Sequence, residues 1–228
     1  MKRFFAYLKR IDRTWIVIWA FIYLSFLSLG IFMPDFFGVT VLKYTGIFLN
    51  LIYSVQKFPH DHLLQTALFF TLLADTILVL DSTSIVGVFV FCIAQFFHMT
   101  RLSKIRPVNL LLYLSLISLL FGFSLIQNIP PIFALCLVYA GSLITNIVFS
   151  YRWRKKSDSI PANCSFFGFL LFLACDSCVA ISYLSFTHAL PYFCYAPANY
   201  LAWFFYYPSQ LLIANSSKTF VKRKTMIQ

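Results

Sequence analysis

The chain has 228 residues, of which 61% are apolar and 11% are charged, whereas a soluble domain has about 45–50% apolar and about 25% charged residues. It carries 18 Lys and Arg against 7 acidic residues, a formal charge of +11, and all seven acids are Asp. This composition leaves too little polar sequence to build a water-soluble body. It therefore excludes a soluble enzyme, a disordered tail and a compact nucleic-acid-binding domain, and it predicts a polytopic membrane protein.

Eight apolar runs have about the 20 residues that a helix needs to cross a bilayer. In chain order the predicted spans are residues 14–33, 36–56, 62–80, 83–100, 108–126, 131–150, 163–187 and 192–214. Prolines such as Pro59, Pro107 and Pro191 mark breaks between runs. The runs are apolar on all sides, unlike the alternating strands of a membrane barrel. We predict an all-α bundle of about eight transmembrane helices that forms a single domain, residues 1–228.

The positions of the cations predict the topology, because cytosolic loops carry an excess of Lys and Arg. All of these residues except Lys43 lie in the two tails or in the loops after the second, fourth and sixth runs. We therefore predict that both termini are cytosolic. We expect the basic tails to contact anionic lipid and not nucleic acid. The short loops and low charge favour a bacterial plasma membrane, with an internal eukaryotic membrane as the alternative.

Three ionisable residues lie within predicted spans, where such residues are expensive and mark functional sites by default. They are Lys43, Asp75 and Asp176. Each aspartate is about 20 Å along its span from the cytosolic end, and Lys43 is about 10 Å below the outer surface. The other five aspartates, Asp61 among them, lie in tails, in loops or at span ends, where we expect water to solvate them.

If their spans adjoin, the three residues could share one polar chamber. Two carboxyl groups in a dry cavity cannot both ionise easily, so one would be neutral and could act as a general acid beside a general base. The alternative is an interhelical polar lock or an Asp–Lys ion pair that aids folding. Polar side chains of other spans could line the same chamber: Gln95, His98, Asn146, Asn199, Trp203, Tyr206, Tyr207 and Gln210.

At these residues the chain resembles the lysoplasmalogenase, or YhhN-like, membrane family. The resemblance lies in Leu72–Leu78 around Asp75 with the following Gln95-Phe-Phe-His98, in Gly168–Ser177 around Asp176, and in Tyr206–Ile213 around Gln210. Lys43 resembles a lysine in the family's second span. The departures are Ala74 in place of Gly, Cys175 in place of Ser, Gln95 and His98 in place of His and Tyr, and Tyr44 in place of Pro.

The resemblance implies hydrolysis of the vinyl-ether bond of lysoplasmalogen, with a lysophospholipid and membrane lipids as partners and no cofactor or metal. Asp75 and Asp176 would be the catalytic acid and base. The expected substrate-binding residues are Lys43, Gln95, His98, Asn199, Tyr207 and Gln210. A proton-coupled transporter is the main alternative, because intramembrane Asp residues also relay protons. A metal-dependent lipid amidase, which would need about three His and an Asp, and a purely structural protein are further alternatives.

Overall fold

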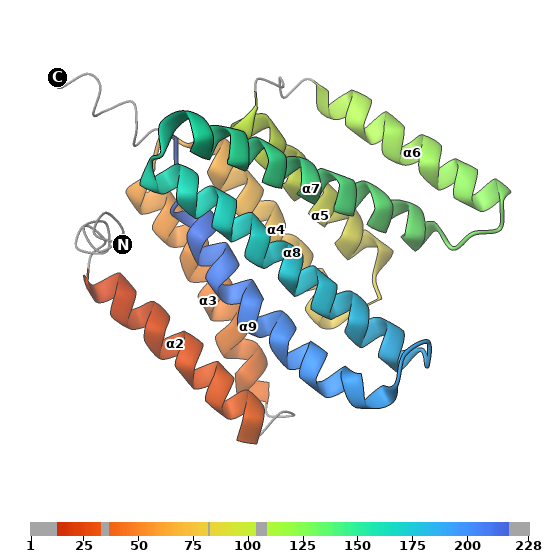
Figure 1. Cartoon of the computed structure of the whole chain (residues 1–228), viewed down its shortest axis with the longest axis horizontal. Helices are drawn as coiled ribbons and strands as arrows, with labels where there is room; N and C mark the ends of the chain where they lie inside the picture. The colour runs from red at the N-terminus through yellow and green to blue at the C-terminus, as the bar shows by residue number, and fades with distance from the viewer. Residues whose placement is uncertain (1–12, 33–36, 82, 104–108, 219–228) are drawn as a thin grey trace. The chain divides into compact units, whose positions relative to one another are not determined.

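The computed structural model describes residues 13–32, 37–81, 83–103 and 109–218, and the structural statements below concern these residues. They are helical almost throughout (Figure 1). In chain order the elements are α2 (Arg13–Phe32), α3 (Phe37–Lys57), α4 (His62–Leu80), α5 (Ile85–Leu102), α6 (Leu110–Ile126), α7 (Pro131–Ser157), α8 (Ile160–Phe186), the short 3-10 helix η2 (Tyr192–Cys194) and α9 (Tyr195–Ala214). Each predicted span has its helix, which confirms the all-α membrane bundle.

Six of these helices are long and apolar enough to cross a membrane, by length and composition alone: α2, α3, α4, α5, α7 and α8. Helix α6 has 17 residues and is about 25 Å long. Helix α9 is continuous, but its sequence contains polar residues such as Asn199 and Gln210. Many of the cations behind the predicted topology lie outside the described residues, in residues 1–12, 104–108 and 219–228. The cytosolic placement of the termini therefore stays a prediction.

Helix α7 runs seven residues past the predicted end of its apolar run at residue 150. Its last turn contains Arg154, Lys155 and Lys156, whose positive charges complement the negative C-terminal end of the helix dipole. Helix α8 begins at Ile160 with Pro161 in its first turn, a position where the missing N–H of proline is not needed. Residues 151–162, which lie between two predicted spans, are thus mostly helical.

The chain divides into two compact units. The first unit is Met1–Asn50 with Asp158–Ser216, and the second unit is Leu51–Ser157 with Ser217–Gln228. The first unit therefore contains α2, most of α3, α8, η2 and α9, and the second contains α4 to α7. The single domain predicted from the sequence stays a prediction, and each unit is described by itself.

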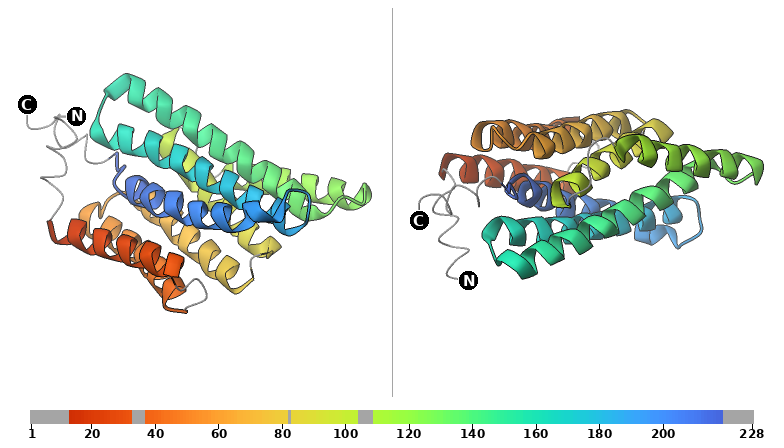
Figure 2. Two further views of the ribbon diagram at one scale, coloured as in Figure 1. Left: turned by 60° about the horizontal axis from the view of Figure 1, so that its bottom comes forward. Right: turned by 90° about the horizontal axis from the view of Figure 1, so that it is seen from above.

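In the first unit, α8 and α9 lie side by side in opposite directions (Figures 1 and 2). The helices approach closely at Gly168, where an added Cβ would lie 2.8 Å from Cγ1 of Ile213 and 3.2 Å from the carbonyl oxygen of Ser209. Further along, the rings of Phe172 and Tyr206 are 5.5 Å apart. Helix α2 joins α9 through Tyr23, whose hydroxyl donates to the carbonyl oxygen of Phe204 at 3.0 Å.

In the second unit, α4 and α5 form an antiparallel pair. Gly87 faces Leu78 so closely that an added Cβ would lie 2.6 Å from the leucine side chain, and the rings of Phe70 and Phe97 stack at 5.5 Å. Helix α7 packs on α5, and α6 lies along α7 (Figure 2). An apolar cluster of Cys92, Ile117, Leu135 and Val138 holds these three helices together.

Candidate functional site

Lys43 lies in the interior of α3, away from both helix ends, and the structure gives its ammonium group an aromatic partner. Its Nζ lies 4.4 Å from the centroid of the Trp203 ring, so α3 and α9 adjoin in the first unit. The ring of Tyr206 meets Trp203 edge-on at 5.5 Å. A cation over the face of an indole is stabilised by the ring's quadrupole. This contact places the ammonium group over the face of the indole ring.

Asp176 lies at the level of Lys43 and Trp203 in the first unit. The antiparallel register of α8 and α9 follows from the Gly168 contacts with Ser209 and Ile213 and from the pair Phe172–Tyr206. Continuing by one helical turn brings Asp176 level with Trp203. Its side chain is partly exposed. The first unit thus places a carboxyl group, an ammonium group and an indole ring at one depth.

Tyr207 has structural contacts on every side. Its ring stacks on that of Tyr23 at 5.4 Å, and its hydroxyl donates to the carbonyl oxygen of Trp19 at 3.4 Å. The ring also lies directly against the backbone of Gly46. These contacts join α2, α3 and α9, so the structure already gives Tyr207 a packing role; the predicted contact with substrate stays a prediction.

Two other predicted residues of α9 have different surroundings. Gln210 is fully buried, and its Oε1 has no hydrogen-bond partner among the described residues. The same holds for Oγ of Ser165 in α8 and for the whole side-chain amide of Asn50 in α3. Asn199, by contrast, is exposed, one turn before Trp203. The buried polar atoms of Asn50 and Ser165 were not anticipated from the sequence, because isolated Asn and Ser residues occur throughout its apolar runs.

Asp75 belongs to the second unit and is 7% exposed. The α4–α5 pairs Leu78–Gly87 and Phe70–Phe97 place it at the level of Phe91. It is preceded by Ala74, which is fully buried. The two predicted catalytic aspartates therefore belong to different units, and the shared chamber stays a prediction.

Gln95 and His98 are both fully buried in α5. Nδ2 of Asn146, in α7, donates to Oε1 of Gln95 at 2.8 Å and to its carbonyl oxygen at 3.1 Å. One turn beyond His98, Arg101 is 4% exposed; the expectation that it lies in a loop was wrong, because α5 continues to Leu102. The second unit thus contains a row of buried polar side chains along one helix.

Asp61 is also buried, at 7% exposure, which corrects the expectation that water solvates it. Its carboxylate accepts hydrogen bonds from Ser217 Oγ at 2.7 Å and from the backbone N–H of Lys218 at 3.2 Å. It also caps α4 by accepting from the N–H of Leu64 at 3.3 Å. Nζ of Lys218 donates to the carbonyl oxygen of Arg101. The sequence held no sign of this contact because Asp61 and Ser217 are 156 positions apart in the chain.

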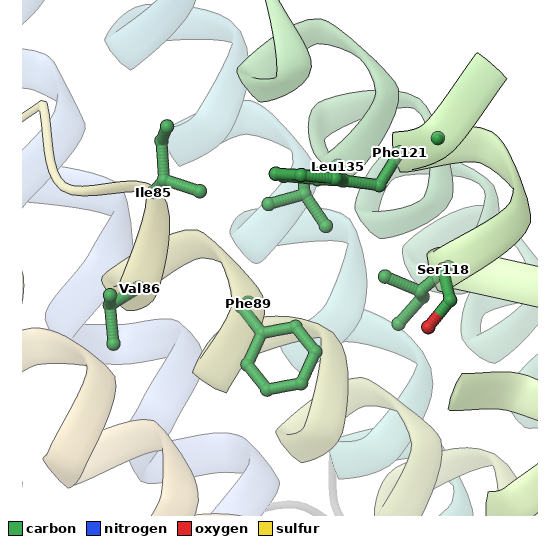
Figure 3. Close-up of a pocket in the computed structure, with 8 residues that line it drawn as sticks. Ile85, Val86, Phe89, Ser118, Phe121 and Leu135 are labelled. Atoms are coloured by element: carbon green, nitrogen blue, oxygen red, sulfur yellow. The ribbon is translucent and has the colours of Figure 1, made fainter. Parts of the chain in front are cut away.

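An apolar groove of about 360 Å³ lies between α5, α6 and α7 of the second unit (Figure 3). Its lining includes Val86 and Phe89 of α5, Ser118 and Phe121 of α6, and Leu135 of α7. No predicted site residue lines it. Within the described ranges, no three His, Cys, Asp or Glu side chains are grouped so that they could hold a metal ion.

The sequence pattern of the YhhN family matches residues 38–217, which is most of the chain. The matched range contains all of the predicted catalytic and substrate-binding residues in both units. No curated protein and no solved structure matches the chain.

Proposed function

Because the chain belongs to the YhhN family, we propose that it is an integral membrane hydrolase that cleaves the vinyl-ether bond of lysoplasmalogen. The products are a fatty aldehyde and a glycerophospho-alcohol. The lipid comes from the membrane in which the helices lie, which we propose is a bacterial plasma membrane. The observation that carries the proposal is the common level of Asp176, Lys43 and Trp203 in the first unit, which places a carboxyl group and a cation at one depth within the apolar helices.

The chemistry needs one proton and one water. A general acid protonates the β-carbon of the vinyl ether, which leaves an oxocarbenium ion. Water adds to the adjacent carbon and loses a proton to a base, and the resulting hemiacetal collapses to the aldehyde and the free alcohol. The proton that was consumed is thus returned, and the net reaction adds one water. We propose that Asp75 and Asp176 divide these steps between them as acid and base.

The other predicted polar residues would hold the substrate. An ammonium group recognises a phosphate as a compact charge, so we propose that Lys43 orients the phosphate of the head group. Gln95, His98 and Gln210 would position polar groups of the substrate or the acids, and Asn199 and Tyr207 would complete the lining. Trp203 holds the Lys43 ammonium at its position.

The test measures aldehyde release from lysoplasmalogen by purified protein in detergent. Asp75→Asn and Asp176→Asn should each lower kcat by about 10²–10⁴-fold, the usual contribution of a general acid or base. Asp81→Asn is the matched control, since Asp81 is a solvated residue at the end of α4. It should retain full activity.

Two further measurements separate this reaction from other lipid hydrolysis. A saturated alkyl-ether lysolipid has no vinyl carbon to protonate and should not react. In D₂O the aldehyde should carry one deuterium on the carbon next to the carbonyl. A folded wild-type protein that releases no aldehyde, or an Asp75→Asn or Asp176→Asn variant with full activity, would contradict the proposal.

A further inference from the structure

Three polar side chains from three helices of the second unit are shut off from the exterior. Thr71 of α4 is 1% exposed, and Gln95 of α5 and Asn146 of α7 are fully buried. Only one pair among them is hydrogen-bonded, through Nδ2 of Asn146 and Oε1 of Gln95 at 2.8 Å. The group therefore has more hydrogen-bonding capacity than its own contacts use.

The unused capacity comprises an amide donor, an amide acceptor and a hydroxyl that can both donate and accept. Nε2 of Gln95, Oδ1 of Asn146 and Oγ1 of Thr71 have no hydrogen-bond partner among the described residues. The orientation of the Asn146 amide is defined by its contacts, because Nδ2 faces two acceptors of Gln95, the side-chain and the backbone oxygen. A reversed amide would bring three oxygens together. Leaving such groups unpaired in an apolar interior is unfavourable.

The three residues lie about one helical turn from the level of Asp75. The stacked rings of Phe70 and Phe97 set the register of α4 on α5, which brings Thr71 level with Gln95. Asp75 is one turn further along the same face of α4.

In the opposite direction, buried polar residues continue along α5. His98 is fully buried and Arg101 is 4% exposed. Arg101 is at the end of α5 that the predicted topology places in the cytosol. Polar groups therefore follow one another from that end of the second unit to the level of Asp75.

We propose that Thr71, Gln95 and Asn146 bind buried water, which supplies the water and proton exchange at Asp75 from the cytosolic end of the second unit. Water is the ligand that fits the unpaired groups, because it both donates and accepts, and buried waters are held by two to four otherwise unpaired polar groups. The binding of water rests on the burial of the three residues, on their unpaired polar atoms and on the register of α4 on α5. Its delivery to Asp75 rests on the proposed function, which consumes one water for each bond cleaved.

Hydroxyl-radical footprinting tests the site without substrate. A pulse of X-rays generates radicals from bound water, and mass spectrometry finds the side chains that they modify. We expect modification of His98, which is fully buried, and none of Phe172, which is 1% exposed and packed on Tyr206 in the first unit. Gln95→Leu and Asn146→Leu should each lose the modification of His98. An unmodified His98 in the wild type, or unchanged modification in both variants, overturns the proposal.

Thermal unfolding of Thr71→Val gives a second answer that does not depend on footprinting. If Oγ1 of Thr71 binds water, its removal leaves that water with one partner fewer and lowers the unfolding midpoint. If the hydroxyl is dry, its removal relieves an unpaired buried group and raises the midpoint. Thr45→Val is the control, because Oγ1 of Thr45 donates within its own helix to the carbonyl of Val41. A higher or unchanged midpoint for Thr71→Val overturns the proposal.

Kinetics then separate water binding from water delivery. If the protein hydrolyses lysoplasmalogen, Gln95→Leu should lower kcat about tenfold, the effect of about one lost hydrogen bond. A lost footprint with full kcat overturns delivery to Asp75. If the wild type hydrolyses no lysoplasmalogen, the proposed function fails, and the footprint and the unfolding midpoint still decide whether the three residues bind water.

Discussion

Ser217 donates a hydrogen bond from its hydroxyl to Oδ2 of Asp61 at 2.7 Å, although 156 positions separate the two residues in the chain. Both residues are buried. The same oxygen accepts from the backbone N–H of Lys218, and the other carboxylate oxygen caps α4 at Leu64. One carboxylate thus starts a helix and fixes the segment that follows α9 to the second unit.

Loss of this contact should weaken the fold. Ser217→Ala removes one donor to a charged acceptor and should lower the free energy of unfolding by about 1.5–3 kcal/mol. Asp61→Ala should have a larger effect, because it also removes the cap of α4, which is itself worth about 1 kcal/mol. Thermal unfolding in detergent measures both effects.

Asp81→Ala is the control for this series. Asp81 also accepts hydrogen bonds from a neighbouring segment, from the N–H and hydroxyl of Thr83, but it is exposed. Its removal should change the unfolding midpoint little. Equal effects of Asp61→Ala and Asp81→Ala would show that the long-range contact to Ser217 does not stabilise the protein.

Lys218 should make stability depend on pH. Burial, the main cause, and the nearby Arg101 together lower the pKa of its ammonium group from 10.5 to about 8, against the opposing effect of Asp61. Between these pH values the unfolded chain holds a proton that the folded chain has released. Stability therefore rises with pH across this window, and below it Lys218 contributes no pH dependence because both states hold the proton.

The measurement compares wild type with Lys218→Met from pH 7 to pH 10. Methionine keeps much of the apolar stem and cannot titrate. Above pH 8, the unfolding midpoint of the wild type should rise relative to that of the variant. Comparing the two proteins removes the contribution of the other titrating groups. Parallel curves would mean that the lysine has its ordinary pKa in the folded protein.

The helices could be predicted from the sequence because membrane spans are defined by length and apolarity, which are local properties. Asp75 and Asp176 stood out for the same reason, as charges within apolar runs. The partner of Asp61 could not be predicted, because hydropathy says nothing of which loop returns to which helix end. Nor could the pairing of Gln95 with Asn146 be predicted, because an isolated polar residue in an apolar span does not indicate which helix it faces.

Gly46 should be intolerant of any side chain. An added Cβ would collide with the ring of Tyr207, which cannot swing away because it is stacked on Tyr23 and bonded to the carbonyl of Trp19. Gly46→Ala should therefore lower the free energy of unfolding by about 1–3 kcal/mol, as other overpacking substitutions do. Gly141→Ala is the matched control, because no atom lies within 4 Å of the added methyl.

Gly141 lies in the interior of α7, where Gly141→Ala should raise the free energy of unfolding by up to about 1 kcal/mol. Both substitutions add one methyl group to a helix. Gly46→Ala should destabilise the protein because of the collision with Tyr207, whereas Gly141→Ala should stabilise it. A neutral Gly46→Ala would mean that α3 and α9 are further apart than the contact with Tyr207 requires.

The contact between Lys43 and Trp203 should be measurable as a coupling energy. Lys43→Met, Trp203→Leu and the double variant form a cycle in which the cation–π term is isolated from the effect of each single change. With Nζ 4.4 Å from the ring centroid, we expect a coupling of about 0.5–2 kcal/mol in unfolding experiments. Lys43→Arg keeps a cation over the indole and should retain much of it.

The same variants test whether the ammonium also serves the substrate. If Lys43 binds the phosphate, Lys43→Met should raise KM for lysoplasmalogen more than it lowers kcat, because the phosphate is bound in the ground state and in the transition state alike. Trp203→Leu should raise KM less, since the ammonium remains but loses its support. An unchanged KM in Lys43→Met, with a normal coupling energy, would mean that Lys43 and Trp203 hold α3 on α9 and take no part in substrate binding.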